Sequence, residues 1–383
     1  MHKSPVSNDT IKHLIFDIKS RIYEKVWDLQ QAKPNNQPIN TEQMVEKLED
    51  QIWKYITTKN VDGRSTYKHL LTWSHSKTTH YLLTQKTAAL AYFNMYELKK
   101  DNKYLELAIN IIDYILANQE PTGIFLMHNH PYLAQDEGPT TAGIIKALLV
   151  AYNYTKKNKY LEAAIRAGEG SRNRIYDEKH GYIHTLGQDY WCTNINSSFA
   201  YSYLFLYKYT DDERFLNWGC DGIKFTLKGQ DKSGLFLYSS KLKHIFRALY
   251  QALILLTLME INDIKRDKKI DRAIKIGIDY AYSMQREDGS IKEPEMNCYA
   301  FLQSCTRFAH LFNMIGDTKR FNKLENFISK FFVKNRIYLE VTPRGILRYG
   351  FRKRYIEANY VRMFEDLTNV MLNKKYKYWQ EKN

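Results

Sequence analysis

A repeated pattern of helices and glycine turns governs this sequence of 383 residues. Its clearest copy runs from Gln135 to Thr185, with an apolar stretch, a lysine-rich turn, an amphipathic stretch and a closing glycine turn. Two separate markers return at steps of 51 to 60 residues. Residues opening the amphipathic stretches are Tyr104, Tyr160, Phe215, Ile270 and Phe321, and the closing glycines are Gly63, Gly123, Gly181, Gly234, Gly289 and Gly345. Because two independent markers share one period, internal repetition decides the fold.

The two stretches of each unit predict two kinds of helix. The first is apolar over much of its circumference, which is typical of a buried helix, whereas the second has a narrower apolar stripe and many lysines. The predicted inner helices span about 86–99, 141–154, 195–209, 245–262, 298–315 and 355–373. The predicted outer helices span about 41–58, 103–118, 159–174, 213–227, 268–284 and 319–333.

Six inner and six outer helices at a fixed period can close into a ring, which removes the end faces that an open solenoid must cap. We therefore predict an all-α (α/α)6 toroid built from six helical hairpins of roughly 55 residues. An open superhelix of the tetratricopeptide type is disfavoured, because its repeat is about 34 residues. The toroid should occupy 41–383, and an N-terminal helix (8–30) with a proline-containing linker should occupy 1–40.

With this periodicity and loop placement, the chain resembles the six-hairpin glycosidase superfamily over roughly residues 41–373. That superfamily includes glycoside hydrolases, unsaturated glucuronyl hydrolases, polysaccharide lyases and sugar epimerases. The sequence matches no catalytic motif of a single family within it, and Trp191-Cys192-Thr193 is not the Cys-His-Gly of the related lanthipeptide cyclases. The resemblance implies that the long loops leading into the inner helices converge on one active face.

The formal charge of +15 concerns partners rather than the fold. We expect no nucleic-acid partner, because no motif of that kind is present. An anionic polysaccharide or a peripheral membrane-surface contact suits a diffuse basic charge better, and plain solvation of the helices is the alternative. Without paired cysteines, a signal peptide or a long apolar run, the chain is expected to be soluble and cytoplasmic, in an oligomeric state that the sequence leaves open.

Candidate catalytic residues precede the predicted inner helices. The second loop carries Asp136 and Glu137, of which at most one should face the cavity because adjacent carboxylates diverge. Their alternative role is to cap the helix. His130 of the same loop is a candidate substrate contact. With His128 it forms an H-x-H pair that lacks a third ligand, so we predict neither a metal nor another cofactor.

The third loop is the richest in candidates. His184, Asp189 and Tyr190 could take part in catalysis. Trp191 could stack on a sugar ring, flanked by amides that bond to sugar hydroxyls, because aromatic faces with convergent polar groups suit a carbohydrate site. The amides are Asn194 and Asn196. A tryptophan packed under the loop, with Asn194 as a helix cap, is the alternative interpretation.

The remaining loops add a second carboxylate and a basic cluster. Glu293 or Glu295 of the fifth loop could face the carboxylates of the other loops across the ring. The sixth loop supplies Arg348, Tyr349, Arg352 and Arg354, and the first loop supplies Trp73 and His80. Arginine forks bind carboxylate, sulfate or phosphate, so they favour an acidic oligo- or polysaccharide over a merely solvated charge run.

These residues support three functional hypotheses. The first is glycoside hydrolysis, which needs a carboxylic acid and a carboxylate on opposite sides of the bond, here two of Asp136, Glu137, Asp189 and Glu295. The second is a uronate lyase or C5-epimerase with a His or Tyr base and Arg neutralisation. His130, His184, Tyr190, Tyr349 and Arg352 could fill those roles. The third is a non-catalytic toroid that binds glycans or serves as a scaffold.

Overall fold

The computed structural model describes a mostly helical chain, with twelve helices and nine short strands in its described part. The described residues are 33–34, 37–53, 56–57, 66–67, 82–126, 137–185, 187–241, 248–293, 299–334, 336–341, 347–348 and 356–376. The predicted helix 8–30 and half of the predicted linker 31–38 lie outside these ranges. No helix within them is long and apolar enough to cross a bilayer.

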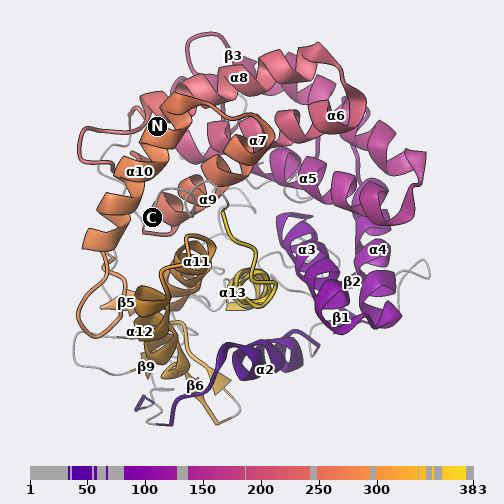
Figure 1. The fold of residues 1–383 in the computed structure, drawn as a ribbon. Coiled ribbons are helices and arrows are strands. Elements are labelled where there is room, and N and C mark those ends of the chain that lie inside the picture. Colours follow the sequence, from indigo (N-terminus) through magenta and orange to yellow (C-terminus); the bar gives the residue numbers. More distant parts are fainter. Residues whose placement is uncertain are drawn as a thin grey trace, which may run out of the picture.

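Six helices form an inner ring, namely α3 (Leu82–Lys99), α5 (Glu137–Thr155), α7 (Thr193–Thr210), α9 (Ala248–Ile264), α11 (Leu302–Met314) and α13 (Ile356–Met371). Six helices surround them, namely α2 (Thr41–Trp53), α4 (Asn102–Leu116), α6 (Asn158–Ile175), α8 (Glu213–Lys228), α10 (Lys268–Ser283) and α12 (Thr318–Ser329). Each inner helix contacts the next, and α13 contacts α3, so the ring is closed (Figure 1). The predicted (α/α)6 toroid is confirmed, with α2 as the outer partner of α13.

Short strands replace the ends of several predicted helices. The predicted helix 41–58 ends at Trp53, because the β-branched pair Ile56–Thr57 (β1) leaves the helix and pairs with Thr66–Tyr67 (β2). The predicted helix 319–333 likewise ends early, because β6 pairs with β7. The remaining strands are β3 (Tyr176–Asp177), β4 (Gly181–Tyr182), β5 (Ala300–Phe301), β6 (Phe332–Val333), β7 (Arg336–Ile337), β8 (Glu340–Val341) and β9 (Leu347–Arg348). Three of these strands form one sheet in the order β5-β8-β9, and β3 pairs with β4.

Short left-handed turns join several inner helices to their outer partners. Lys100, Lys156 and Asp211 have φ of 53°, 54° and 53°. Each donates its backbone N–H to the carbonyl oxygen four residues earlier, at 2.7 to 2.8 Å, which satisfies one of the last carbonyls of the inner helix. Asp101 and Asp212 follow directly, and their carboxylates cap the first turn of the outer helix.

A glutamine four residues before a glycine fixes the turn that closes three of the units. Each glutamine donates its side-chain amide to its own glycine's carbonyl oxygen and to a carbonyl oxygen of the next outer helix. The glycines have φ of 89°, 94° and 90°, and a Cβ on each would lie 2.2 Å from a carbonyl oxygen of that helix. Only glycine suits this conformation and this close approach. The pairs are Gln119–Gly123, Gln230–Gly234 and Gln285–Gly289.

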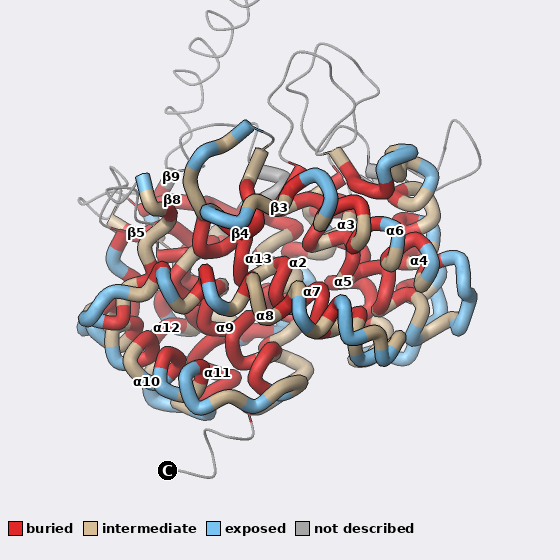
Figure 2. Tube along the Cα trace, turned by 90° about the horizontal axis from the view of Figure 1, so that it is seen from above, coloured by how far each residue is buried: buried red, intermediate tan, exposed pale blue. Residues whose placement is uncertain are grey.

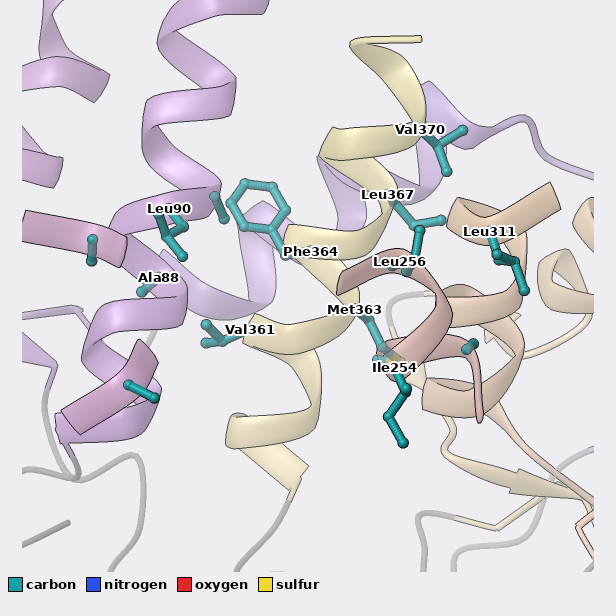
Figure 3. Close-up of a cluster of buried hydrophobic side chains, with 14 of the residues drawn as sticks. Ala88, Leu90, Ile254, Leu256, Leu311, Val361, Met363, Phe364, Leu367 and Val370 are labelled. Carbon is teal, nitrogen blue, oxygen red and sulfur yellow. The ribbon is translucent and has the colours of Figure 1, made fainter. Parts of the chain in front are cut away.

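The seam that closes the ring is apolar. Phe364 of α13 meets Tyr92 of α3 edge to face, with ring centroids 5.6 Å apart. Figure 3 shows Val361 and Phe364 on the side of α13 that faces α3, whereas Met363 and Leu367 point away from α3. All are almost fully buried. Because each buried side chain of this size stabilises the fold by about 1.5–3 kcal/mol, α13 holds the ring together from both sides.

Alanine at two glycines with positive φ should separate backbone strain from close packing. Gly234 has a φ of 94° and a carbonyl oxygen 2.2 Å from the added Cβ, whereas Gly187 has a φ of 83° and nothing within 4 Å. We expect Gly187→Ala to lower the free energy of unfolding by about 1 kcal/mol. Gly234→Ala should lower it by at least about 3 kcal/mol. Urea denaturation measures both, and equal losses would contradict the close approach.

Candidate active site

Six long connections between hairpins lead into the N-termini of the inner helices, and these N-termini lie at the end of the ring opposite the short turns. The connections span 54–81, 117–136, 176–192, 229–247, 284–301 and 330–355. Figure 2 shows their strands β3, β4, β5, β8 and β9 at one end of the ring. The inner helices therefore direct their N-terminal N–H groups and the positive ends of their dipoles to this end, which suits anionic or hydroxyl-rich ligands. We call it the loop end.

Side chains of the inner helices fasten the preceding loops. The Thr141 hydroxyl accepts the backbone N–H of Phe125 at 2.9 Å and donates to its carbonyl oxygen at 3.0 Å. The Asn196 amide makes the same pair of bonds to Tyr182, at 2.9 and 3.1 Å, and Gln251 holds the fourth loop in a similar way. The structure therefore gives Asn196, a predicted substrate contact, a positioning role in a repeated clamp.

Glu137 and His184 meet at the junction of α5 with the third loop. The carbonyl oxygen of His184 accepts the N–H of Gly138 at 3.0 Å, one residue into α5. The Glu137 side chain is 5% exposed and pairs with Arg174 of α6, with 3.3 Å between Oε1 and the guanidinium. Nδ1 of His184 lies 3.3 Å from the hydroxyl of Thr185. The structure thus brings two predicted catalytic residues to one junction, with the carboxylate bonded to an outer helix.

The predicted aromatic platform lies beside two lysines. The exposed Asp189 forms an ion pair with Lys241, and this hydrogen bond lowers the pKa of Asp189, so its carboxyl group is ionised at neutral pH. The ammonium of Lys228 lies 4.3 Å from the ring centroid of Trp191 and covers one face of the indole. Burial raises the pKa of the half-buried Tyr190, so its hydroxyl stays protonated. Lys228 therefore occupies one face of the ring that was predicted to stack on a sugar.

Several buried polar atoms in the first turns of the inner helices have no hydrogen-bond partner among the described residues. They include Oδ1 of Asn194 in α7, Oγ1 of Thr140 in α5, and both amide atoms of Gln85 in α3. Buried polar groups are nearly always hydrogen-bonded, to protein, water or ligand. These hydroxyl and amide groups therefore make the loop end suited to a ligand rich in hydroxyls.

Other predicted residues lie outside the described ranges. They are Asp136, Glu295, His130, Trp73, His80, Tyr349, Arg352 and Arg354. Arg348 is placed by its backbone in β9, opposite Glu340 of β8. Glu293 is described and buried: its Oε2 accepts the N–H of Ala248 at 3.2 Å, and its Oε1 accepts the hydroxyl of Ser304. Within the same ranges, no three His, Cys, Asp or Glu side chains form a group that could hold a metal ion.

A salt bridge crosses the interior of the ring. Lys146 of α5 donates to Glu260 of α9 at 2.9 Å, and its ammonium lies 4.7 Å from the ring centroid of Tyr201 in α7. Because α7 stands between α5 and α9 in the ring, a direct bond between these two helices requires both side chains to point inward. The two side chains are 29% and 35% exposed, so solvent reaches the interior.

More charged side chains gather in the same interior. Nε of Arg307 lies 2.8 Å from Asp366, and its guanidinium lies 3.9 Å from Glu365. The Lys86 ammonium interacts electrostatically with Glu365, Lys146, Arg307 and Arg362, which come from α5, α11 and α13. We call the whole group the axial cluster, defined as Lys86, Lys146, Glu260, Arg307, His310, Arg362, Glu365 and Asp366.

The axial cluster has two levels. Lys86, Arg307 and Arg362 follow the first residue of their helices by 4, 5 and 6 positions, which is about 6–9 Å along the helix axis. Lys146, His310 and Glu365 follow by 9, 8 and 9 positions, or about 12–14 Å. Three cations therefore lie closer to the loop end than the mixed level beneath them.

Burial controls the charges of this cluster. It lowers the pKa of Lys86 to about 8, an effect that Glu365 opposes. It lowers the pKa of His310 to about 3, with a contribution from Arg307, so the imidazole is neutral. It also raises the pKa of Asp366 to about 7, although Arg307 opposes this shift. At neutral pH four cations thus outweigh three carboxylates, one of which is partly protonated.

Sequence reasoning missed the axial cluster because it searched only the loops. A signal was present in the helices. Lys146 is the only basic residue of the otherwise apolar α5. A lone lysine on an inner helix cannot be buried in the apolar core at a tolerable cost, so it must face a polar interior.

The comparisons with known proteins concern the fold. No protein-family model matches the sequence, and no curated protein is similar to it. Solved structures are similar, among them a cellobiose 2-epimerase from Bacillus thermoamylovorans with a TM-score of 0.63 and 14% identity, covering 85% of this chain and 99% of that one. A D-mannose isomerase has a TM-score of 0.66 and 12% identity, with coverages of 87% and 97%. A possible GH105 protein from Salmonella enterica serovar Paratyphi A has a TM-score of 0.60 and 9% identity, with coverages of 90% and 94%. The resemblance to the six-hairpin toroid proteins is confirmed at the level of the fold.

The axial lysine should make stability depend on pH in a defined direction. The pKa of Lys86 falls from 10.5 to about 8 on folding. Below pH 8, Lys86 is protonated in both the folded and the unfolded state, so the folded state is destabilised by the full cost of burying the charge. This destabilisation decreases as the pH rises toward 10.5. We expect Lys86→Met to raise the free energy of unfolding by about 1–3 kcal/mol at pH 7 and by much less at pH 10.

Urea denaturation of both proteins at the two pH values measures this difference. Lys275→Met removes an exposed lysine from the outer helix α10 and should change nothing at either pH. Destabilisation by Lys86→Met at pH 7 would show that Lys86 has a stabilising partner.

Proposed function

We propose that this chain is a carbohydrate-active enzyme that binds a sugar at the loop end and transfers a proton at one of its carbon atoms, as epimerases and isomerases do. The similarity to a cellobiose 2-epimerase and a D-mannose isomerase, over 99% and 97% of their chains, supports this reaction class. Buried side-chain atoms of Asn194, Thr140 and Gln85, which lack a hydrogen-bond partner among the described residues, support a sugar as the ligand.

The ion pairs of the described carboxylates favour proton transfer at carbon over glycoside hydrolysis. Glycoside hydrolysis needs a protonated carboxylic acid beside the leaving oxygen and a second carboxylate across the bond. Glu137 is ion-paired with Arg174 of the outer layer. Asp189 is exposed, and its pKa is lowered by Lys241. The carboxyl group of Asp189 is therefore ionised and cannot act as the protonated acid, whereas proton transfer at carbon does not require one.

In the proposed reaction, His184 removes a proton from the carbon next to the sugar's carbonyl or carboxyl group. The electron pair moves onto that group's oxygen, where hydrogen-bond donors stabilise the negative charge as it develops. Tyr190, whose pKa is raised, can donate such a bond. A water molecule then donates a proton to the opposite face of the same carbon, which gives the epimer, and the hydroxide left behind takes the proton from His184 and regenerates the base.

Glycoside hydrolysis is the second candidate. It would use two carboxylates among Asp136, Glu137, Asp189 and Glu295, and the similarity to a possible GH105 protein over 94% of its chain supports it. The two reactions differ in what happens to hydrogen bound to carbon, because hydrolysis leaves the sugar's C–H bonds intact.

Incubation with cellobiose, mannose and glucuronate in heavy water distinguishes the candidates. Proton transfer predicts deuterium at a carbon of the sugar and the appearance of a new epimer or isomer, both visible by NMR. New reducing ends without deuterium would show that the protein hydrolyses glycosidic bonds, and hydrolysis would then replace proton transfer as the proposed reaction. If neither change occurs in a saccharide that the protein binds, the chain is a binding scaffold and the proposal is wrong.

Two histidines of the third loop provide a matched pair of variants. We expect His184→Asn to lower kcat by about 10²–10⁴-fold, the range for loss of a general base. His180→Asn should leave kcat unchanged, because His180 is bonded at 2.8 Å to Asp177 of its own turn. Equal effects of the two substitutions would remove His184 from the mechanism.

A further inference from the structure

Two cations of the axial cluster stand apart from its ion pairs. Lys146 is bonded to Glu260, and Arg307 is paired with Asp366 and Glu365. Among the residues that the structure describes, Lys86 and Arg362 form neither a hydrogen bond nor an ion pair. They lie on the contacting helices α3 and α13, and their charges interact. Both side chains are partly accessible to solvent.

Lys86 packs closely against the neighbouring helix α5 at a residue without a side chain. A Cβ atom on Gly143 of α5 would lie 2.8 Å from Cε and 3.3 Å from Nζ of Lys86, so the lysine lies against bare backbone. Gly143 follows the first residue of α5 by 6 positions and therefore lies at the level of the three cations. The partly exposed Ser198 of α7, 5 positions into its helix, also has a short side chain. The upper level of the cluster thus combines cations on one side with small residues on the other.

We propose that Lys86 and Arg362 bind the oxyanion of an acidic sugar, a carboxylate or a phosphate, inside the ring. This inference rests on the proposed sugar site at the loop end. A guanidinium presents two parallel N–H groups that match two oxygens of such an anion, and an ammonium adds a point charge with three donors. Because both cations lie within two turns of the helix N-termini, the acidic group points down the axis while the sugar occupies the loop end.

A purely structural role does not account for these two cations. A charge taken from water without a partner costs stability, and the surplus of positive charge in the cluster adds repulsion. An anion that neutralises Lys86 and Arg362 removes both costs when it binds. Residues that destabilise the free protein but contact a ligand are expected at functional sites.

Isothermal titration calorimetry in a phosphate-free buffer tests the inference. The probes are D-glucuronate, D-glucose 6-phosphate, inorganic phosphate and D-glucose. We expect at least one sugar acid to bind about tenfold or more tightly than glucose, and Lys86→Met and Arg362→Met each to reduce that affinity by about tenfold. Lys86→Arg, which keeps the charge, should restore most of it. Lys275→Met on α10 is the matched control and should bind like the unmodified protein.

The outcomes separate the site from the function. Preference for glucuronate identifies a carboxylate, and preference for glucose 6-phosphate identifies a phosphate. Binding of inorganic phosphate without any sugar would support the oxyanion site and contradict the proposed function. Equal binding of glucose and the sugar acids would leave the function standing and overturn the inference. The inference would also be overturned if the Lys86→Met variant, shown to be folded by its thermal stability, bound the sugar acid with unchanged affinity.

Discussion

The packing of α13 between α11 and α3 is the constraint on which the rest of the structure depends. It joins the last inner helix to the first, and α2 from the beginning of the described chain covers α13 from outside. The seam is apolar, with Phe364 against Tyr92 and with Met44 and Leu48 of α2 fully buried. Because a closed ring has no end faces, every inner helix gains two inner neighbours and at least one outer neighbour.

Closure also creates the interior in which the oxyanion site is proposed. Six parallel helices direct their N-termini to one end, and their inward faces approach each other closely enough for Lys146 to bond to Glu260 across α7. The interior is polar at its centre and apolar in its walls, so charges there interact more strongly than they would on the outer surface. The loop end offers neutral hydrogen-bonding groups to a sugar, and the level beneath it offers cations.

The fold could be predicted from the sequence, because the glycine turns and the contrast between apolar and amphipathic helices are local signals that recur in every unit. The site could be predicted only as a region. The direction of a loop side chain depends on partners far along the chain: Arg174 bonds Glu137, and Lys228 covers Trp191. The axial cluster escaped prediction because its eight members are spread over five inner helices, and no short motif contains them.

A double-mutant cycle between Lys146 and Glu260 tests most directly whether the inner faces of the helices meet in one charged interior. The free energies of unfolding are measured for the unmodified protein, Lys146→Met, Glu260→Gln and the double variant. The two residues lie 114 positions apart on helices that are not neighbours in the ring, so only inward-facing side chains can couple them. Inward-facing side chains predict a coupling energy of about 1 kcal/mol. Additive effects, within about 0.3 kcal/mol, would contradict the charged interior in which the two side chains meet.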